Sequence, residues 1–249
     1  MKFEKHFLRS VRLDERRSPP PDRYPFSLPA VRAIAGLEFH PSVTFLVGEN
    51  GSGKSTLLEA VAVRLGLNPE GGSKNFKFST RESHSELCDH LVLVRTARFP
   101  RDCWFLRAES FFNVATEIEQ LDSGGGPGRR IIESYGRQGL HSQSHGESFF
   151  ALFNHRLGGE GLYLLDEPEA ALSPARQMAF LAKLHELVGR GSQFIIATHS
   201  PIIMSYPSAS IYVIGQHGVR LTALEETEHF RVTRDFLANP ARSLKELME

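Results

Sequence analysis

Apolar residues in this sequence fall into two kinds of run, short continuous runs and longer runs with helical spacing. Val43–Val47 is a continuous β-prone run, which is typical of a strand buried on both faces. In Lys54–Leu65 the apolar side chains at positions 57, 58, 61 and 65 keep helical spacing, and Gly66 marks the end of the run. A glycine-rich turn separates the two. The pattern therefore predicts a strand, a loop and a helix in this order.

The same alternation continues toward the C-terminus. Strands are predicted over residues 37–39, 90–96, 103–108, 162–165 and 193–197, and helices over residues 148–157 and 174–188. Strands that alternate with helices predict an α/β fold whose sheet is mainly parallel and covered on both faces. The length of 249 residues fits a single domain over residues 1–249.

Three segments depart from this pattern. Residues 1–28 are rich in Arg and Pro, and the triple proline at positions 19–21 stops any helix, so an N-terminal arm or edge segment is expected. Residues 122–130 include a run of glycines typical of a flexible surface loop. Residues 227–249 are expected to form a C-terminal tail.

Charge and cysteine content bear on the binding partners and the cellular compartment to be expected. Lys plus Arg and Asp plus Glu number 29 each, so the overall charge gives no reason to expect a polyanionic partner or an anionic membrane, and nucleic-acid binding stays open without support from charge. Cys88 and Cys103 form no CxxC pattern, which favours a reducing compartment. Because the sequence shows neither a signal peptide nor an apolar stretch of membrane-spanning length, a cytoplasmic protein without membrane insertion is expected.

The turn after the first strand carries the strongest chemical signal. Gly48–Ser55 matches GxxxxGK[ST], and it lies between an apolar strand and an amphipathic helix, the context of a P-loop. Glycines let backbone amides curl around phosphates, and the helix N-terminus adds a favourable dipole. The alternative is a glycine-rich turn that fits the pattern by chance. The residues predicted to bind ATP here are Gly48, Glu49, Asn50, Gly51, Ser52, Gly53, Lys54, Ser55 and Thr56.

Two carboxylates follow a later buried strand, Leu162–Leu165. This places Asp166 and Glu167 at the carboxyl edge of the sheet, where α/β proteins bind ligands. Such a strand could also end in solvated acids. With a P-loop upstream, the pattern indicates a Walker B element, in which Asp166 and Ser55 hold Mg²⁺ and Glu167 is the general base for the attacking water.

A third strand ends near His199, within the sequence Ala-Thr-His-Ser-Pro. A lone histidine is usually structural, but this one is expected at the same edge as the P-loop and Asp166, which favours a hydrogen bond to the γ-phosphate of ATP. With this third motif the sequence resembles the ABC ATPase superfamily.

The resemblance implies further site residues. The family's signature is matched in part by residues 143–148, where Ser144 and Gly146 fit and Glu147 replaces the usual Gln. By resemblance, this motif opens a helix that faces the γ-phosphate held by a second copy. An ordinary helix start would look similar. The family's D-loop resembles residues 170–173, and its H-loop residues 198–200.

Two positions follow the family pattern less closely. Glu109 stands where the family's Q-loop Gln is expected and is a candidate Mg²⁺ ligand. The aromatic residue that stacks on adenine in transport cassettes has two candidates, Tyr24 and Phe26, and either could instead belong to the core.

The whole sequence most resembles a compact bacterial family of stand-alone ABC-type ATPases, related to the heads of chromosome-maintenance and repair ATPases. The stretches FLVGENGSGKSTLLEA, QSHGESFFALF, LYLLDEPEAALSP and FIIATHSPI carry the resemblance. It implies a RecA-like core, a small helical lobe and an antiparallel β edge. It also implies ATP and Mg²⁺ as cofactors and an ATP-driven dimerising switch that acts on an unidentified macromolecule. The alternatives are the nucleotide-binding subunit of an ABC transporter and an ATP-binding module without turnover, which Glu167 disfavours.

Overall fold

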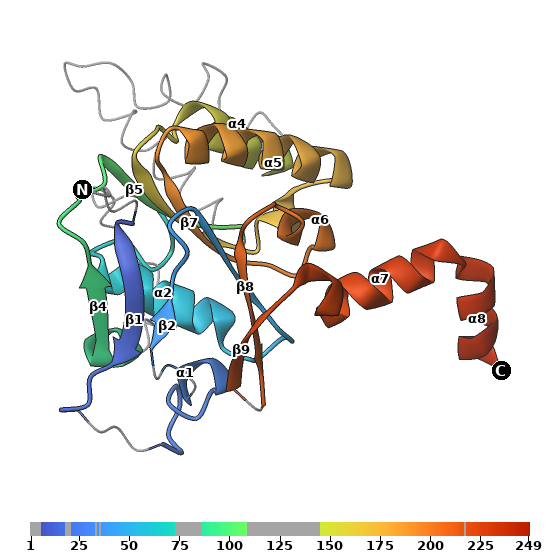
Figure 1. The fold of residues 1–249 in the computed structure, drawn as a ribbon, viewed down its shortest axis with the longest axis horizontal. Coiled ribbons are helices and arrows are strands. Elements are labelled where there is room, and N and C mark those ends of the chain that lie inside the picture. The colour runs from blue at the N-terminus through green and yellow to red at the C-terminus, as the bar shows by residue number, and fades with distance from the viewer. Residues whose placement is uncertain are drawn as a thin grey trace.

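The computed structural model describes residues 6–17, 21–32, 34, 36–72, 86–108, 145–216 and 218–249. These residues form two sheets and a set of helices in layers (Figure 1). A six-stranded sheet lies in the middle, a helix and a small antiparallel sheet cover one face, and helices cover the other.

The central sheet is mainly parallel. In spatial order its strands are β5 (Asp102–Arg107), β6 (Gly161–Asp166), β7 (Gln193–Ala197), β3 (Val43–Val47), β8 (Ser210–Gly215) and β9 (Gly218–Thr222). Only β9 pairs antiparallel to its neighbour. Every residue of β3, β6 and β7 is buried, because layers cover both faces of these strands. The predicted α/β fold with a mainly parallel, covered sheet is confirmed.

The second sheet is antiparallel and has three strands. Its order is β2 (Leu37–Glu38), β1 (Leu8–Leu13) and β4 (Leu91–Arg95), so β1 is the middle strand. Leu8 and Val11 are fully buried. The expectation of an arm is therefore wrong for residues 8–13, because their apolar side chains find two neighbouring strands and a core to pack against.

One buried side chain joins the two sheets. The amide oxygen of Gln193, at the start of β7, accepts the backbone N–H groups of Phe7 and Leu8, each at 3.0 Å. Its amide nitrogen donates to the carbonyl oxygens of Leu8 at 2.8 Å and His40 at 3.0 Å. The Gln193 side chain thus satisfies four backbone groups between the sheets that would otherwise lack partners.

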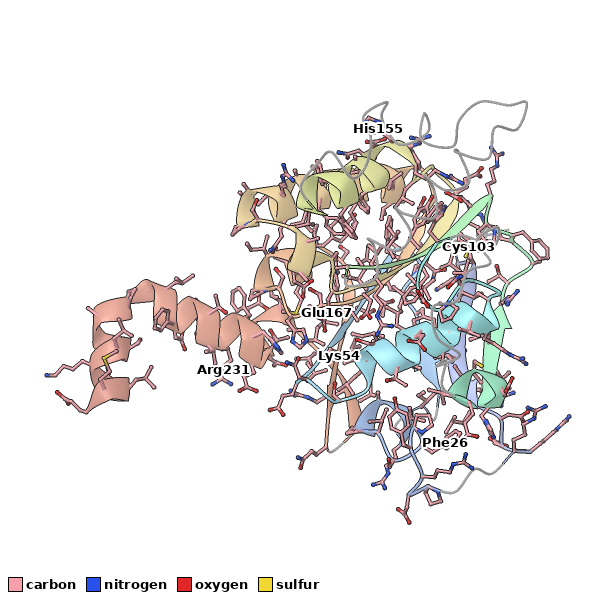
Figure 2. All side chains as sticks on the ribbon, turned by 180° about the vertical axis from the view of Figure 1, so that it is seen from behind. Phe26, Lys54, Cys103, His155, Glu167 and Arg231 are labelled. Carbon is pink, nitrogen blue, oxygen red and sulfur yellow. The ribbon has the colours of Figure 1, made fainter. Side chains whose placement is uncertain are left out.

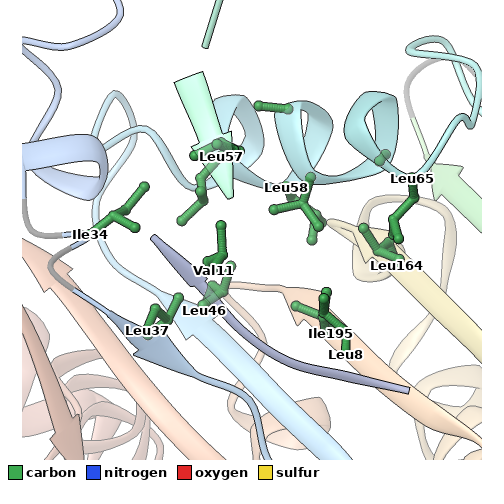
Figure 3. Packing of buried hydrophobic residues seen from close by; sticks show 14 of the residues in the cluster. Leu8, Val11, Ile34, Leu37, Leu46, Leu57, Leu58, Leu65, Leu164 and Ile195 are labelled. Carbon is green, nitrogen blue, oxygen red and sulfur yellow. The ribbon is translucent and has the colours of Figure 1, made fainter. Parts of the chain in front are cut away.

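The helices on the two faces build two cores. α2 (Lys54–Arg64) lies between the sheets, and Figure 3 shows Leu57, Leu58 and Leu65 beside the sheet residues Leu46, Leu164 and Ile195. The other core lies under α4 (His145–His155), α5 (Pro174–Gly189) and α6 (Pro201–Met204). The remaining short helices are α1 (Pro29–Arg32), η1 (Glu86–His90), η4 (Pro168–Ala171) and η5 (Leu224–Glu226).

The tail forms two helices, α7 (Glu228–Ala238) and α8 (Pro240–Met248). Figure 1 shows both helices extending away from the sheets, and Figure 2 shows from behind that α7 starts near Lys54 and Glu167. Each carries an apolar face, and several of its large side chains are exposed. None of the helices among the described residues is long and apolar enough to cross a membrane.

Candidate functional site

Three parallel strands place their carboxyl ends at one edge of the central sheet. In the register of the sheet, Leu46 of β3 and Asp166 of β6 both lie opposite Ala197 of β7. The P-loop begins after β3, Glu167 follows β6, and His199 follows β7 by two residues. The predicted convergence of these motifs at one edge is therefore observed.

The backbone of the P-loop depends on its glycines. A Cβ atom on Gly48 would collide with the carbonyl oxygen of Ile214, so only glycine allows β8 to pass this close. Gly53 caps α2 with φ at 92° and ψ at 13°, in the left-handed region that disfavours other residues. The free amides of the first turn of α2 are thereby aimed at the position where phosphates bind in P-loop proteins.

Lys54 is the buried cation of the loop. Its Nζ atom donates to the carbonyl oxygens of Gly48 at 2.7 Å and Glu49 at 2.9 Å, and its exposed fraction is 3%. Burial lowers the pKa of the Lys54 ammonium group, while the charges of Glu167 and Asp166 act in the opposite direction. The loop carbonyls hold this charge in place for an anionic ligand.

Ser55 and Asp166 bring two hard oxygen donors together. The Ser55 hydroxyl donates to Oδ1 of Asp166 at 2.9 Å, and the Asp166 carboxylate is buried. No cluster of three or more possible metal-ligating His, Cys, Asp or Glu side chains occurs among the described residues. Mg²⁺ commonly takes one or two protein oxygens and completes its shell with phosphate oxygens and water, so this pair fits that ion.

Arg107 neutralises the same carboxylate from the end of β5. Its Nε atom lies 3.2 Å from Oδ2 of Asp166, and its Nη1 atom lies 2.9 Å from Oε2 of Glu59 on α2. This contact was not predicted from the sequence. A cation just before the Q-loop position was the available signal, but its partner depends on how β5 packs beside β6.

Glu167 and His199 face each other across the site. Glu167 has φ at 48° and ψ at 53°, and its backbone N–H bonds to the Ala197 carbonyl oxygen at 2.9 Å. Its Oε1 atom lies 3.4 Å from Nε2 of His199. Nε2 is buried and has no hydrogen-bond partner in the described part of the chain. Buried polar atoms are normally satisfied, so this atom fits a ligand group that binds beside the two residues.

Glu169 holds the turn that carries His199. Its Oε2 atom accepts the Thr198 hydroxyl at 2.8 Å, and its Oε1 atom accepts the backbone N–H of His199. Burial raises the pKa of Glu169, and these hydrogen bonds act against that shift. Glu169 is the third acid of the Asp-Glu-Pro-Glu sequence. Its role could not be predicted from the sequence, because its hydrogen-bond partners lie in the turn after β7.

His229, from the start of α7, reaches the same site. Its Nε2 atom lies 3.0 Å from Nδ1 of His199, and the two ring centroids are 5.1 Å apart. Burial and then the charge of Lys54 lower the pKa of each histidine. Nothing in the sequence links these two positions.

A cavity of about 380 Å³ lies beside the P-loop. Tyr24, Lys54, Ser55, Thr56 and Glu167 are among the residues that line it. Tyr24 is exposed and free to face a nucleotide base, and stacking by it stays a prediction. Its alternative, Phe26, is buried in the core with its ring centroid 4.8 Å from that of His90, so Phe26 does not serve as an adenine platform.

The remaining predicted site residues lie partly outside the described part of the chain. Glu109 and Ser144 fall outside it. Gly146 and Glu147 are in the first turn of α4, which begins at His145, one residue after Ser144. Their roles in nucleotide binding stay predictions.

Comparison with known proteins gives matches to two domain families. Residues 32–102 match the family described as "AAA domain". Residues 146–205 match the family described as "AAA domain, putative AbiEii toxin, Type IV TA system".

Two curated proteins and one solved structure extend these matches. The ABC transporter G family member STR2 of Medicago truncatula is 27% identical over 68% of this chain, but only 25% of its own length is covered. The cytochrome c biogenesis ATP-binding export protein CcmA of Paracoccus denitrificans is 27% identical over 74% of this chain and 83% of its own length. A structure titled as an inward-facing conformation of a "putative metal-chelate type ABC transporter" aligns with 91% of this chain and 87% of its own, with a TM-score of 0.52 and 14% identity.

Proposed function

We propose that this chain, which is a P-loop ATPase of the ABC type, works as a cytoplasmic switch that dimerises when it binds ATP and opens after hydrolysis. One observation carries the proposal. Lys54, the Ser55–Asp166 pair and the Glu167–His199 pair lie together at one edge of the sheet, while 33% of the Glu167 side chain remains exposed. A second copy could therefore cover the site.

In this proposal each residue of the site has its own role in ATP hydrolysis. Lys54 and the amides of the P-loop bind the phosphates, and Ser55 and Asp166 would hold Mg²⁺, which neutralises phosphate charge when bound. Glu167 accepts a proton from the attacking water. In this proposal the ring of His199 donates a hydrogen bond to the γ-phosphate of ATP.

The second half of the site comes from the partner copy in this proposal. Ser144, Gly146 and Glu147 of one copy contact the γ-phosphate held by the other. The helix dipole at the start of α4 favours an anion there. ATP then joins the two copies through charge-assisted hydrogen bonds, and the closed dimer acts on a macromolecular partner.

A transporter subunit is the second candidate. It is favoured by the printed names of the curated relatives, which are an ABC transporter and an ATP-binding export protein. In that case the chain would co-purify with a membrane-spanning subunit. A stand-alone switch would be recovered without one.

Glu167→Gln tests the proposal. The amide keeps the shape of the site but cannot accept a proton, so we expect turnover to fall by about 10²-fold or more while ATP still binds. With saturating Mg²⁺ and ATP, light scattering should give twice the monomer mass. The matched control is Glu186→Gln, which changes an exposed acid on α5 and should keep wild-type turnover. A Glu167→Gln chain that stays monomeric at saturating ATP contradicts the dimerising switch.

A further inference from the structure

The C-terminal tail supplies a side chain to the site. α7 starts at Glu228, and its capping residue Thr227 is buried with an exposed fraction of 1%. The Thr227 hydroxyl donates to the Leu224 carbonyl oxygen at 2.7 Å and accepts the Phe230 backbone N–H at 3.4 Å. These contacts fix the first turn of α7, and His229 lies within that turn. Its half-buried ring also lines a cavity of about 370 Å³, which the P-loop residues Gly48–Ser52 line as well.

The two imidazole rings share one hydrogen bond. His229 Nε2 and His199 Nδ1 are 3.0 Å apart, and one of them must donate the hydrogen that lies between them. A neutral imidazole carries its hydrogen on one nitrogen only. Burial lowers the pKa of both rings, which favours their neutral forms. The donor in this pair therefore decides which nitrogen of His199 carries a hydrogen.

The other side of His199 identifies the donor. Its Nε2 atom lies 3.4 Å from Oε1 of Glu167 and faces the position proposed for the γ-phosphate. Carboxylate and phosphate oxygens only accept hydrogen bonds when ionised. If His199 carried its hydrogen on Nδ1, the Nε2 lone pair would face those oxygens without a hydrogen between them. The arrangement is favourable only when Nε2 carries the hydrogen and Nδ1 accepts one.

We propose that His229 is a positioning residue, which donates its Nε2–H to Nδ1 of His199 and so holds His199 in the tautomer that donates from Nε2 to the γ-phosphate. Glu169 fixes the backbone of His199, and His229 fixes its ring. The effect on turnover rests on the proposed ATPase switch, but the hydrogen bond itself exists without nucleotide.

Two substitutions of similar size separate donation from simple packing. Glutamine at position 229 can donate an amide N–H to His199, whereas glutamate can only accept. We expect His229→Gln to keep most of the wild-type turnover. We expect His229→Glu to lower kcat by about 10–100-fold, the usual cost of losing the partner that orients a site histidine. Thr233→Ala, at an exposed position of α7, is the matched control.

The decisive measurement is nitrogen NMR of the histidine rings in the full chain without nucleotide, with His199 assigned from a His199→Gln variant. We expect His199 Nδ1 to be unprotonated and Nε2 to carry a hydrogen in the wild type and in His229→Gln. In His229→Glu the hydrogen should move to Nδ1. A protonated Nδ1 in the neutral ring of wild-type His199, or the same ring state and kcat in both variants, would overturn the proposal.

This test is independent of the dimer. If the NMR result holds and Glu167→Gln stays monomeric with ATP, the tautomer inference stands and the dimerising switch fails. If Glu167→Gln dimerises and wild-type Nδ1 is protonated, the reverse is true. Thermal unfolding of each variant shows whether a loss of kcat reflects a loss of folded protein.

Discussion

The Lys54 ammonium group lies inside the P-loop. Two backbone carbonyl oxygens hold it, and its side chain is almost fully buried. The loop has no second lysine or arginine within Gly48–Ser55, so its remaining phosphate-binding groups are neutral amides and hydroxyls. Removing this one charge should therefore remove most of the attraction for ATP.

Lys54→Ala is expected to weaken ATP binding by about 100-fold or more, because the phosphates lose their only cation within the loop. Calorimetry with ATP and Mg²⁺ measures the affinity. Lys245→Ala removes the same charge from an exposed position on α8 and should bind ATP as the wild type does. Wild-type affinity in the Lys54 variant would mean that the P-loop is not the nucleotide site.

Residues that act through tertiary contacts could not be predicted from the sequence. Five of the site residues follow recognisable strands, so their meeting at one edge follows from the parallel sheet. These residues are Lys54, Ser55, Asp166, Glu167 and His199. Arg107, Glu169 and His229 have no such marker. Each contacts the site through a turn or helix whose position depends on the packing of the whole chain.

At the scale of elements, the short helix η4 connects two strand ends. It directly follows Glu167 and carries Glu169, whose carboxylate accepts both the Thr198 hydroxyl and the His199 backbone N–H. The turn after β7 is thus tied to the turn after β6. Two partly buried donors depend on a single side chain for their acceptor.

Glu169→Ala should lower the free energy of unfolding by about 1–3 kcal/mol, the usual cost of leaving buried donors without an acceptor. Urea unfolding of the nucleotide-free protein measures it. The control is Glu186→Ala, whose exposed acid forms surface ion pairs on α5, and a stability close to that of the wild type is expected there. Equal stabilities of the two variants would show that Glu169 has no structural role.

Most elements with a continuous or helically spaced apolar run were predicted, but the strand β8, although its run Ile211–Ile214 is continuous, and its neighbour β9 were not. The strands at 43–47 and 193–197 have the predicted bounds, and the helix predicted from residue 174 ends one residue later than expected. The helix expected from residue 148 begins three residues earlier, at His145. The strand at residues 8–13 was missed, because its two buried apolar side chains, Leu8 and Val11, are three residues apart across a register shift and so do not alternate.

At the scale of the whole molecule, the proposed mechanism needs two copies. Each composite site would take its P-loop from one copy and its signature from the other. A chain with Lys54→Ala and a chain with Ser144→Arg would then each fail alone. Mixed together, they would form dimers with one intact site and one site broken on both sides.

An equimolar mixture of these two variants should therefore recover part of the wild-type ATPase activity. Turnover is measured for each variant alone and for the mixture at the same total protein concentration. A mixture that is no more active than its separate components would show that each copy hydrolyses ATP alone or with a different partner.

The side-chain amide of Gln193 determines when the first hydrogen bonds of β1 can be completed during translation. It binds the backbone of Phe7 and Leu8 across sequence separations of 186 and 185 residues. The strand β1 therefore cannot complete its hydrogen bonds until β7 has been made. Contacts this distant in sequence form slowly, since a long loop must close first. During translation, the backbone groups of residues 7 and 8 therefore lack these partners until the chain has been synthesised as far as Gln193.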